Sequence, residues 1–262
     1  MPTISGMIKR GYPPKALVNF VKKAGIAKRE NTIDASLLEF YVREELNKIC
    51  PRVMVVTNEI KLVITNYPEG KQEKLEAINN PEDESQGTRE MVFSKYLYIE
   101  REDFRETANR KFFRLTIGNE VRLKNAYIIK GEKCIKNKNG EVIEVHCTYD
   151  PKSKSGSNSE ESKRKVKGTI HWVDIKSSTN VTINEYERLF LNEKPEEYED
   201  LIKCINTTSK KRIVGKSEKY VSSLKKGQKV QFQRKGYYIV DDNKNGNITF
   251  NKTVSLRDGW RK

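Results

Sequence analysis

The sequence predicts a mainly β protein that begins with a small α-helical part. Two observations lead to this fold class. Apolar residues recur at helical spacing only before Pro51, and after it they alternate with polar residues over many short runs, as in half-buried strands. Turn signals separate these runs at short intervals, which favours antiparallel barrels or sandwiches over a parallel sheet with crossover helices.

The first helix is expected to begin at Pro13-Pro14, because proline fits the first turn of a helix, and to end at Gly25. The residues before it, Pro-Thr-Ile-Ser-Gly (2–6), are interpreted as a turn at a junction between two structured units. The apolar stripe of this helix consists of Leu17, Phe20, Val21 and Ala24.

The second helix can be capped by Asn31, Thr32 or Asp34, and Pro51 is expected to end it. Residues 1–50 together are small for an independent core. The apolar stripe of the second helix consists of Leu37, Leu38, Tyr41, Val42 and Leu46.

Strands are expected in every alternating run after Pro51. Asn139-Gly140 lies between two such runs and indicates a hairpin, and Gly246 indicates another turn. The segment 152–165 is rich in Ser, Lys and Glu and poor in apolar residues, so a mobile loop is expected there. The alternating runs cover residues 53–58, 60–66, 91–100, 120–130, 141–149, 167–175, 181–190, 229–240 and 248–258.

The charge balance indicates a polyanionic partner. The 262 residues include 51 Lys and Arg against 36 Asp and Glu, a formal net charge of +15. Cations that neutralise phosphates release condensed counterions, which favours nucleic-acid binding. The alternative is a lysine-rich composition without functional meaning. No apolar run approaches the ~20 residues of a membrane span, and no signal peptide is evident, so a cytoplasmic protein is expected.

Cysteine and histidine do not indicate a metal site or a nucleophilic active site. The four cysteines form no Cys-x-x-Cys pair, and the two histidines are His146 and His171. Each histidine lies within a strand-like run, without the partners that a catalytic triad needs. No catalytic residue and no metal ligand is therefore predicted.

Collinear blocks along the whole chain resemble one family. They include PTISGMIKRGYPP (2–14), REELNKICPRVMVV (43–56), FFRLTIGNEVRLKNAYIIK (112–130), RKVKGTIHWV (164–173) and FQRKGYYIVD (232–241). These blocks resemble the C-terminal, tRNA-reading half of the glutaminyl-tRNA synthetases, which are class I aminoacyl-tRNA synthetases.

The resemblance implies two antiparallel β-barrels after a helical subdomain, similar to barrels found in a ribosomal protein that binds 5S rRNA. The helical subdomain would comprise residues 1–50. The proximal anticodon-binding barrel would comprise residues 51–62 and 172–262, and the distal one residues 63–171.

The resemblance also implies a division of labour. In this family an N-terminal domain activates the amino acid through a HIGH-type motif and a KMSKS-type loop, and neither motif occurs in this sequence. The chain alone is therefore expected to bind tRNA-Gln as a monomer but not to aminoacylate it. No cofactor is expected in this chain, because ATP and Mg²⁺ would bind the catalytic domain, which is expected in cis, before Met1, or in trans.

The family assigns anticodon contacts to positions that match here. Arginine suits guanine or phosphate because it donates two parallel hydrogen bonds, and glutamine suits a pyrimidine because it offers a donor and an acceptor. The implied contacts are Arg52 and Gln231 to the middle base, with Arg234 nearby, Arg114 to the third base, Arg122 to the first base, and Arg257 in a C-terminal contact.

The helical subdomain is expected to contact the tRNA backbone. Four cations, Lys9, Arg10, Lys22 and Lys23, would line it, although an ordinary solvated helix face fits them equally well. The anticodon candidates have simpler interpretations too. Arg122 could belong to a solvated strand face, Arg52 could cap the carbonyl end of the second helix, and Gln231 could be half-exposed on a strand.

Other functions remain open. The same fold would suit a standalone ribosomal or structural RNA-binding protein, or a trans-acting tRNA-binding subunit of a separate catalytic chain. Eukaryotic-type glutamyl-tRNA synthetases share these barrels, but the PTISG block favours the glutaminyl branch.

Overall fold

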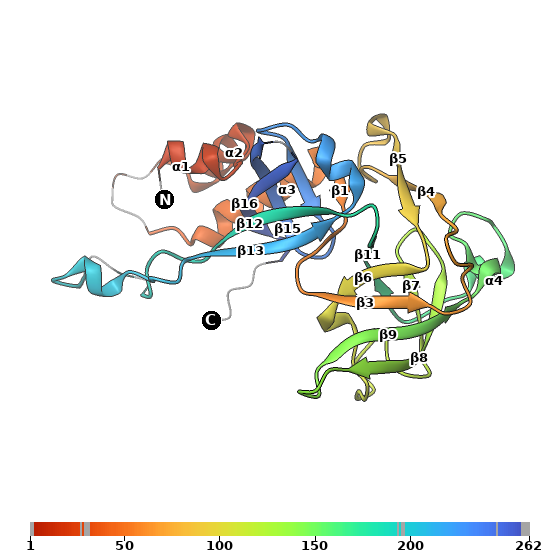
Figure 1. Ribbon diagram of the computed structural model, residues 1–262. Helices are drawn as coiled ribbons and strands as arrows, with labels where there is room; N and C mark the ends of the chain where they lie inside the picture. The colour runs from red at the N-terminus through yellow and green to blue at the C-terminus, as the bar shows by residue number, and fades with distance from the viewer. Residues whose placement is uncertain are drawn as a thin grey trace.

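The predicted fold class is confirmed. The computed structural model shows a small helical part packed on a seven-stranded sheet, with a second seven-stranded sheet beside it (Figure 1). Both sheets curl into nearly closed barrels, and most of their strand pairs are antiparallel. The structure describes residues 3–26, 28, 32–192, 194, 197–244 and 246–257.

The N-terminal part contains α1 (Ile4–Lys9), α2 (Pro14–Ala24) and α3 (Ala35–Ile49). The turn expected at residues 2–6 is wrong, because helix α1 begins at Ile4. The Thr3 hydroxyl caps it by accepting a hydrogen bond from the backbone N–H of Gly6 at 3.1 Å. The predicted bounds of α2 are confirmed, since it begins at Pro14 and its cap, Gly25, has a φ of 74°.

Asp34 is the cap of α3, and its carboxylate accepts from the backbone N–H of Ser36 at 2.8 Å. Thr32 is not the cap, and Asn31 lies outside the described residues. Helix α3 ends at Ile49, before Pro51, as predicted.

The helices bury one shared face against the sheet. Ala16 of α2 and Val42 and Leu46 of α3 are fully buried, and they pack with Tyr237 and Val254 of the sheet. Val21 was expected in the buried stripe but is 60% exposed, because only the Ala16 side of α2 meets the sheet and α3.

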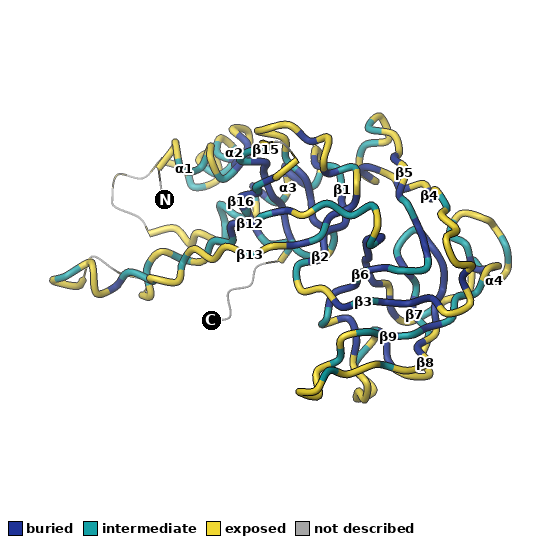
Figure 2. Tube along the Cα trace, viewed as in Figure 1, coloured by how far each residue is buried: buried dark blue, intermediate teal, exposed yellow. Residues whose placement is uncertain are grey.

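The first sheet, called sheet A, has the order β1-β14-β15-β16-β12-β13-β2. Strands β1 and β2 follow each other in the chain but lie at opposite edges of this order, so the sheet curls round towards closure. Buried residues gather inside it (Figure 2). Its strands are β1 (Arg52–Val53), β2 (Val55–Val56), β12 (Thr179–Tyr186), β13 (Lys210–Ser217), β14 (Lys229–Phe232), β15 (Gly236–Lys244) and β16 (Asn247–Ser255).

The second sheet, called sheet B, has the order β10-β7-β8-β9-β3-β6-β11, and its edge strands β10 and β11 are separated by one residue, His171. A two-stranded ribbon of β4 and β5 lies beside it. The strands are β3 (Glu59–Ile64), β4 (Glu73–Ile78), β5 (Thr88–Phe93), β6 (Tyr96–Glu100), β7 (Glu120–Leu123), β8 (Ile128–Lys136), β9 (Val142–Tyr149), β10 (Thr169–Ile170) and β11 (Trp172–Asp174).

The predicted turns at Asn139-Gly140 and Gly246 join β8 to β9 and β15 to β16. Strands β4 and β13 were not predicted, because charged residues interrupt their alternation. Several predicted runs are pairs of strands: residues 91–100 divide into β5 and β6, and residues 229–240 divide into β14 and the start of β15.

The chain crosses between the sheets at positions a few residues from those expected. The boundary after residue 62 falls inside β3, and the boundary after residue 171 falls before β11, yet both strands belong to sheet B. The crossings lie at residues 57–58 and 175–178. The strands that precede the crossings, β2 and β11, are buried at every residue, so alternation gives no sign of the boundary.

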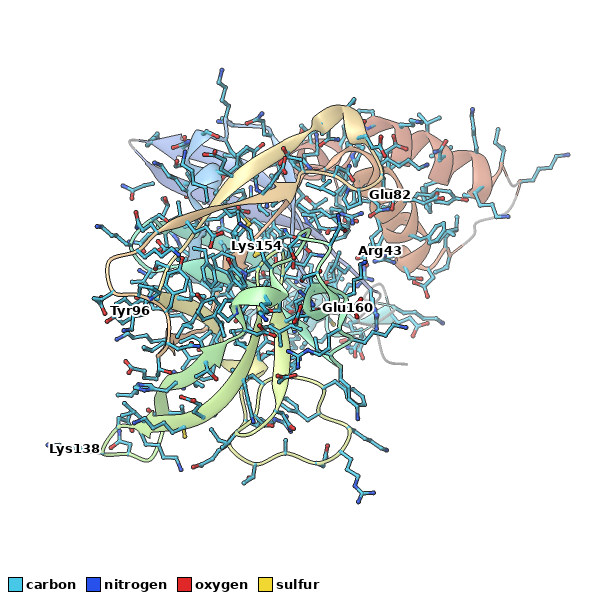
Figure 3. All side chains as sticks on the ribbon, turned by 90° about the vertical axis from the view of Figure 1, so that its right-hand side faces the viewer. Arg43, Glu82, Tyr96, Lys138, Lys154 and Glu160 are labelled. Atoms are coloured by element: carbon cyan, nitrogen blue, oxygen red, sulfur yellow. The ribbon has the colours of Figure 1, made fainter. Side chains whose placement is uncertain are left out.

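The segment 152–165 is folded and not the mobile loop that its composition suggested. It contains a 3₁₀ turn (Pro151–Ser153) and the short helix α4 (Glu160–Lys163). The Ser153 hydroxyl accepts from the backbone N–H of Ile128 at 2.8 Å, and the Ser159 hydroxyl caps α4. Figure 3 labels Lys154 and Glu160 within this segment. Serine side chains here replace the apolar contacts that usually hold a loop.

Within the described residues, no helix is long and apolar enough to cross a bilayer.

Candidate nucleic-acid interface

Arg52 and Gln231 are direct neighbours across the β1–β14 pair. The two strands run parallel, and Arg52 lies in register with Gln231. The backbone fixes this register, because the N–H of Gln231 donates to the carbonyl of Pro51 at 2.8 Å. Residues in register on adjacent strands project to the same face, so the fold brings together the two residues implied for the middle anticodon base.

A network of side chains links this pair. The Nη2 of Arg52 donates to Oδ1 of Asn47 at 3.0 Å, and the same oxygen accepts from the Tyr237 hydroxyl at 3.2 Å. The Tyr237 hydroxyl in turn accepts from Nε2 of Gln231 at 2.8 Å. Asn47 and Tyr237 therefore hold both base-contact candidates in fixed orientations.

The simpler interpretations of this pair are wrong. Arg52 does not cap the carbonyl end of α3. That role belongs to Asn80, whose Nδ2 donates to the Lys48 carbonyl at 2.8 Å. Gln231 is not half-exposed either, since only 7% of its surface is accessible. The Nε of Arg52 is buried and has no hydrogen-bond partner within the described residues, and Glu82 lies 3.8 Å from its guanidinium.

Arg114 and Arg234 converge on one buried carboxylate, that of Asp103. Arg234 binds it through both nitrogens, with Nη1 2.5 Å from Oδ2 and Nη2 2.7 Å from Oδ1. The Nη1 of Arg114 lies 3.2 Å from Oδ1. Arg234 comes from the turn between β14 and β15 of sheet A, whereas Arg114 and Asp103 belong to the sheet B half. The carboxylate thus joins the two halves at the site.

A second buried carboxylate, Glu100, supports the same junction. It accepts from the backbone N–H of Thr57 at 2.8 Å, and it lies 2.9 Å from Nζ of Lys235 and 3.5 Å from His171. Burial alone would raise the pKa of Glu100, but the hydrogen bond from His171 and the charge of Lys235 lower it to about 2.

Arg122 binds a different part of the chain, the segment 152–165. Its Nη1 donates to the Ser153 carbonyl at 3.0 Å and its Nη2 to the Ser162 carbonyl at 2.7 Å, so its guanidinium holds the segment 152–165. Burial and the nearby charge of Arg164 lower its pKa. Arg122 is therefore not part of a solvated strand face.

The four cations of the helical part divide into two groups. Arg10 donates to the Thr253 carbonyl at 2.8 Å, and its guanidinium lies 5.3 Å from the Tyr12 ring and 5.4 Å from the Tyr186 ring, so it fastens α1 to sheet A. The other cations, Lys9, Lys22 and Lys23, are exposed. Arg257 follows β16 and is exposed as well.

Lys124 is a cation that sequence reasoning did not select. It is half-buried, and burial, together with the nearby charge of Arg52, lowers its pKa. Its position two residues after Arg122 was a usable signal, since alternate residues of an extended segment face the same side.

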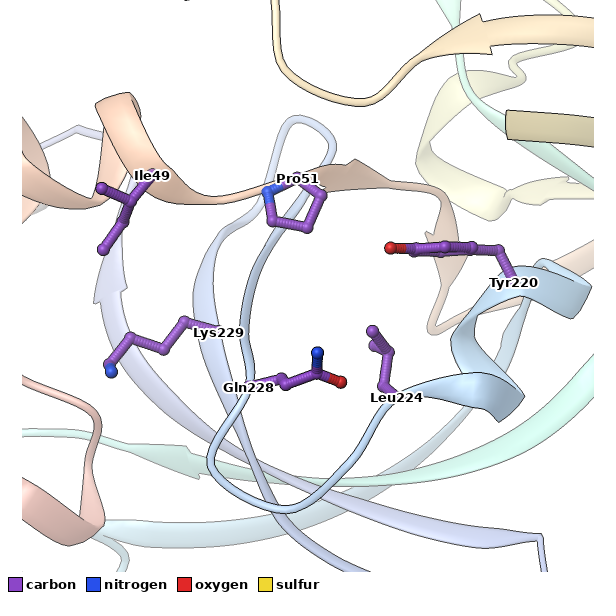
Figure 4. A pocket seen from close by; sticks show the side chains of 6 residues that line it. All are labelled: Ile49, Pro51, Tyr220, Leu224, Gln228 and Lys229. Carbon is purple, nitrogen blue, oxygen red and sulfur yellow. The ribbon is translucent and has the colours of Figure 1, made fainter. Parts of the chain in front are cut away.

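A small cavity of about 260 Å³ adjoins the site. Pro51 lines it and precedes Arg52 in the chain, and Lys229 lies across from Pro51 (Figure 4). Burial raises the pKa of the neighbouring Cys50 thiol to about 12, so this cysteine stays protonated at neutral pH. The other lining residues are Ile49, Tyr220, Leu224 and Gln228.

Two family models match the chain. Both describe the anticodon-binding domain of class I tRNA synthetases for glutamate and glutamine, one at residues 50–150 and the other at residues 169–241. The first match covers most of sheet B together with β1 and β2, and the second covers β10 to β15 except the end of β15.

Curated relatives match along the whole chain. A glutamine–tRNA ligase of Rhodopirellula baltica is 49% identical over 266 residues, covering 100% of this chain and 44% of the relative. Glutamine–tRNA ligases of Clostridium perfringens and Clostridium kluyveri are 47% and 43% identical, and the match covers 48% and 47% of their lengths. The chain spans about half the length of the curated relatives it matches. The chain therefore belongs to the family of anticodon-binding domains of the class I glutamyl- and glutaminyl-tRNA synthetases.

Proposed function

We propose that this chain is the tRNA-binding, anticodon-recognising region of a glutamine–tRNA ligase and that it binds tRNA-Gln. The observation that carries the proposal is that the fold pairs the implied contact residues: Arg52 lies in register with Gln231 on sheet A, and Arg114 and Arg234 meet at Asp103 between the two sheets. Sequence-specific RNA recognition acts best on unstacked loop bases, whose edges are bound in pockets. Fixed guanidinium and carboxamide groups beside each other suit that task.

The middle base would be read by Arg52 and Gln231, with Arg234 nearby. Both side chains are held by Asn47 and Tyr237, so little conformational entropy is lost when a base binds. The side chain of Arg52 is 20% exposed, which leaves part of it open to a base. Lys124 would neutralise a phosphate beside this pair.

The third base would be read by Arg114. Its guanidinium is anchored through Nη1 only, at Asp103 and at the Glu102 carbonyl, which lies 3.1 Å away. The Nε and Nη2 edge makes no hydrogen bond within the described residues, and its side chain is 39% exposed. Such a fork matches the O6 and N7 acceptors of guanine.

For Arg122 we propose a role other than the first-base contact that the family implies. Because both terminal nitrogens of Arg122 bind carbonyls, we assign Arg122 to holding the segment 152–165 against the site. Arg257 and the exposed cations Lys9, Lys22 and Lys23 would contact the tRNA backbone, in keeping with the net charge of +15. Arg10 would act on the tRNA only indirectly, by fixing α1.

The catalytic steps would belong to another part of the enzyme. The relatives are about twice as long as this chain, and we propose that ATP, Mg²⁺ and glutamine bind their remaining half. This chain alone would then bind tRNA-Gln in the cytoplasm without charging it.

A binding experiment tests the proposal. Fluorescence anisotropy would compare tRNA-Gln with transcripts in which the middle or third anticodon base is replaced. We expect the replaced transcripts to bind at least about tenfold more weakly, since each lost bidentate contact costs ~1–3 kcal/mol. Lys138→Ala, at the tip of the β8–β9 hairpin (Figure 3), is the control. Equal binding of all transcripts, or tighter binding of 5S rRNA, would overturn the proposal.

A further inference from the structure

We infer that Asp103 is a positioning residue that couples recognition of the middle and third anticodon bases, by fixing Arg234 and Arg114 with one carboxylate. This inference rests on the proposed function. The side chain of Asp103 is fully buried, whereas those of Arg234 and Arg114 are 31% and 39% exposed. The anchor is therefore inside the molecule, and the guanidinium groups that it holds reach the surface.

The local backbone builds this arrangement. Asp103 ends a 3₁₀ turn (Arg101–Asp103) directly after β6, and its carbonyl accepts from the N–H of Leu115 at 3.0 Å, which brings Arg114 alongside. Arg234 arrives from the other sheet. It has a φ of 66°, a left-handed conformation that is costly for a residue with a side chain. The bidentate ion pair with Asp103 offsets that cost.

The geometry leaves donors available to a ligand. A guanidinium has five N–H groups. Arg234 uses two on Asp103, and its Nη1 also lies 3.4 Å from Nδ1 of His171. Its remaining groups, and the Nε and Nη2 edge of Arg114, have no partner within the described residues. One negative charge held between two cations leaves a net positive site, which favours a base edge or a phosphate.

The arrangement predicts coupled effects. Each arginine orients the shared carboxylate for the other, so loss of Asp103 releases both guanidinium groups together. Loss of Arg114 alone affects the third base. Asp103 would thus determine specificity at two bases without touching either of them.

A purely structural role for Asp103 makes a different prediction. If Asp103 only fastens sheet A to sheet B, its removal weakens binding of every tRNA in parallel and leaves the ratio between cognate and substituted tRNA unchanged. The ratio is therefore the decisive measurement, because a general loss of folded protein cancels in it.

The experiment uses the 262-residue chain and transcripts of tRNA-Gln, with replacements at the middle or third anticodon base, at two salt concentrations. For Asp103→Asn we expect discrimination at both bases to fall by about tenfold. Asp103→Asn removes a negative charge and no cation. The number of phosphates that the chain neutralises should therefore not fall, and the salt dependence of binding should not weaken. Arg114→Ala should reduce discrimination at the third base only.

The matched control is Glu100→Gln. It removes the other buried carboxylate of the same junction, which binds Lys235 and His171 and reaches Arg234 only through His171, whose Nδ1 lies 3.4 Å from Nη1 of Arg234. Its discrimination ratios should stay within about twofold of the wild type, well below the effect of a lost bidentate contact. Asp103→Glu is the second variant, which keeps the charge but displaces the carboxylate, and it decides the matter if Asp103→Asn does not fold.

The outcomes separate the two proposals. If the wild type discriminates and the folded Asp103 variant discriminates equally well, the inference about Asp103 is wrong and the proposed function stands. If Glu100→Gln loses discrimination as strongly as Asp103→Asn, the effect belongs to the junction in general and the inference is wrong as well. If the wild type itself does not discriminate, the proposed function fails first.

Discussion

Arg89 and Glu218 form a buried bidentate ion pair that joins the β4–β5 ribbon to sheet A. Nε of Arg89 lies 2.9 Å from Oε2 of Glu218 and Nη2 lies 2.7 Å from Oε1, and the two side chains are only 5% and 4% exposed. Glu218 also accepts from the backbone N–H of Met54 at 2.7 Å. The pair therefore holds the start of sheet A, just after Arg52, in a fixed place.

Replacing Arg89 with Met should destabilise the chain by about 3–5 kcal/mol, because Glu218 would keep a buried charge without its partner. Urea unfolding monitored by tryptophan fluorescence would measure the loss. Lys74→Met, which breaks the exposed pair with Glu90 on the same ribbon, should change stability by less than ~1 kcal/mol. Equal losses in the two variants would contradict this account of the buried pair.

Replacing Tyr237 with Phe should reduce discrimination at the middle base while costing only about 1 kcal/mol of stability. The hydroxyl is the link between Gln231 and Asn47, so its removal frees the carboxamide that is proposed to face the base. Binding of tRNA-Gln and of a transcript with a replaced middle base measures the effect.

The control for this variant is Tyr238→Phe. The hydroxyl of Tyr238 donates to Glu185 at 2.8 Å and has no link to Arg52 or Gln231. The same chemical change should therefore leave the discrimination intact. A loss of specificity in Tyr238→Phe and not in Tyr237→Phe would refute the role given to the network.

The fold class could be predicted from the sequence because its signals are local. The change of period at Pro51, the Gly25 cap and the Asn139-Gly140 hairpin each depend on residues close together in the chain. Strand β13 was not predicted, because its own residues give no local strand signal. Its run of charged residues hides a strand that pairs with β12 and with the distant β2.

The site could be predicted only in part. The types of Arg52, Gln231 and Arg114 suit base recognition, and the resemblance selected them, but their anchors are contacts between distant segments. Asp103 and Arg234 are 131 positions apart, and nothing local in the sequence marks Asp103 as the partner of two arginines. Arg122 shows the converse, since the resemblance implied a base contact whereas its guanidinium donates to two carbonyls of the segment 152–165.

Acid should remove the stabilisation that Glu100 provides. Its pKa in the folded chain is about 2, against an ordinary value of 4.5, so the unfolded chain takes up the proton first as the pH falls. The contribution is fully present above about pH 4.5 and is lost between that pH and about 2; it amounts to ~3 kcal/mol, given 1.36 kcal/mol per pKa unit.

Urea unfolding of the wild type and of Glu100→Gln at several pH values would test this. The difference in stability between the two proteins should be largest at neutral pH and shrink below pH 4.5. A difference that stays constant from neutral pH down to the acid range would show that the lowered pKa of Glu100 does not contribute.

Replacing Arg122 with Ala should unfold the segment 152–165 while the barrels stay folded. The Ser153 and Ser162 carbonyls would lose their shared donor, and the segment has few apolar contacts to replace it. Hydrogen exchange should show faster exchange of the amides of residues 152–165, with no change in strands β12 to β16. Arg110→Ala, an exposed arginine in the same half, is the control. If Arg122→Ala loses discrimination at the first anticodon base while exchange in the segment is unchanged, Arg122 touches the base directly and its assignment as a loop holder is wrong.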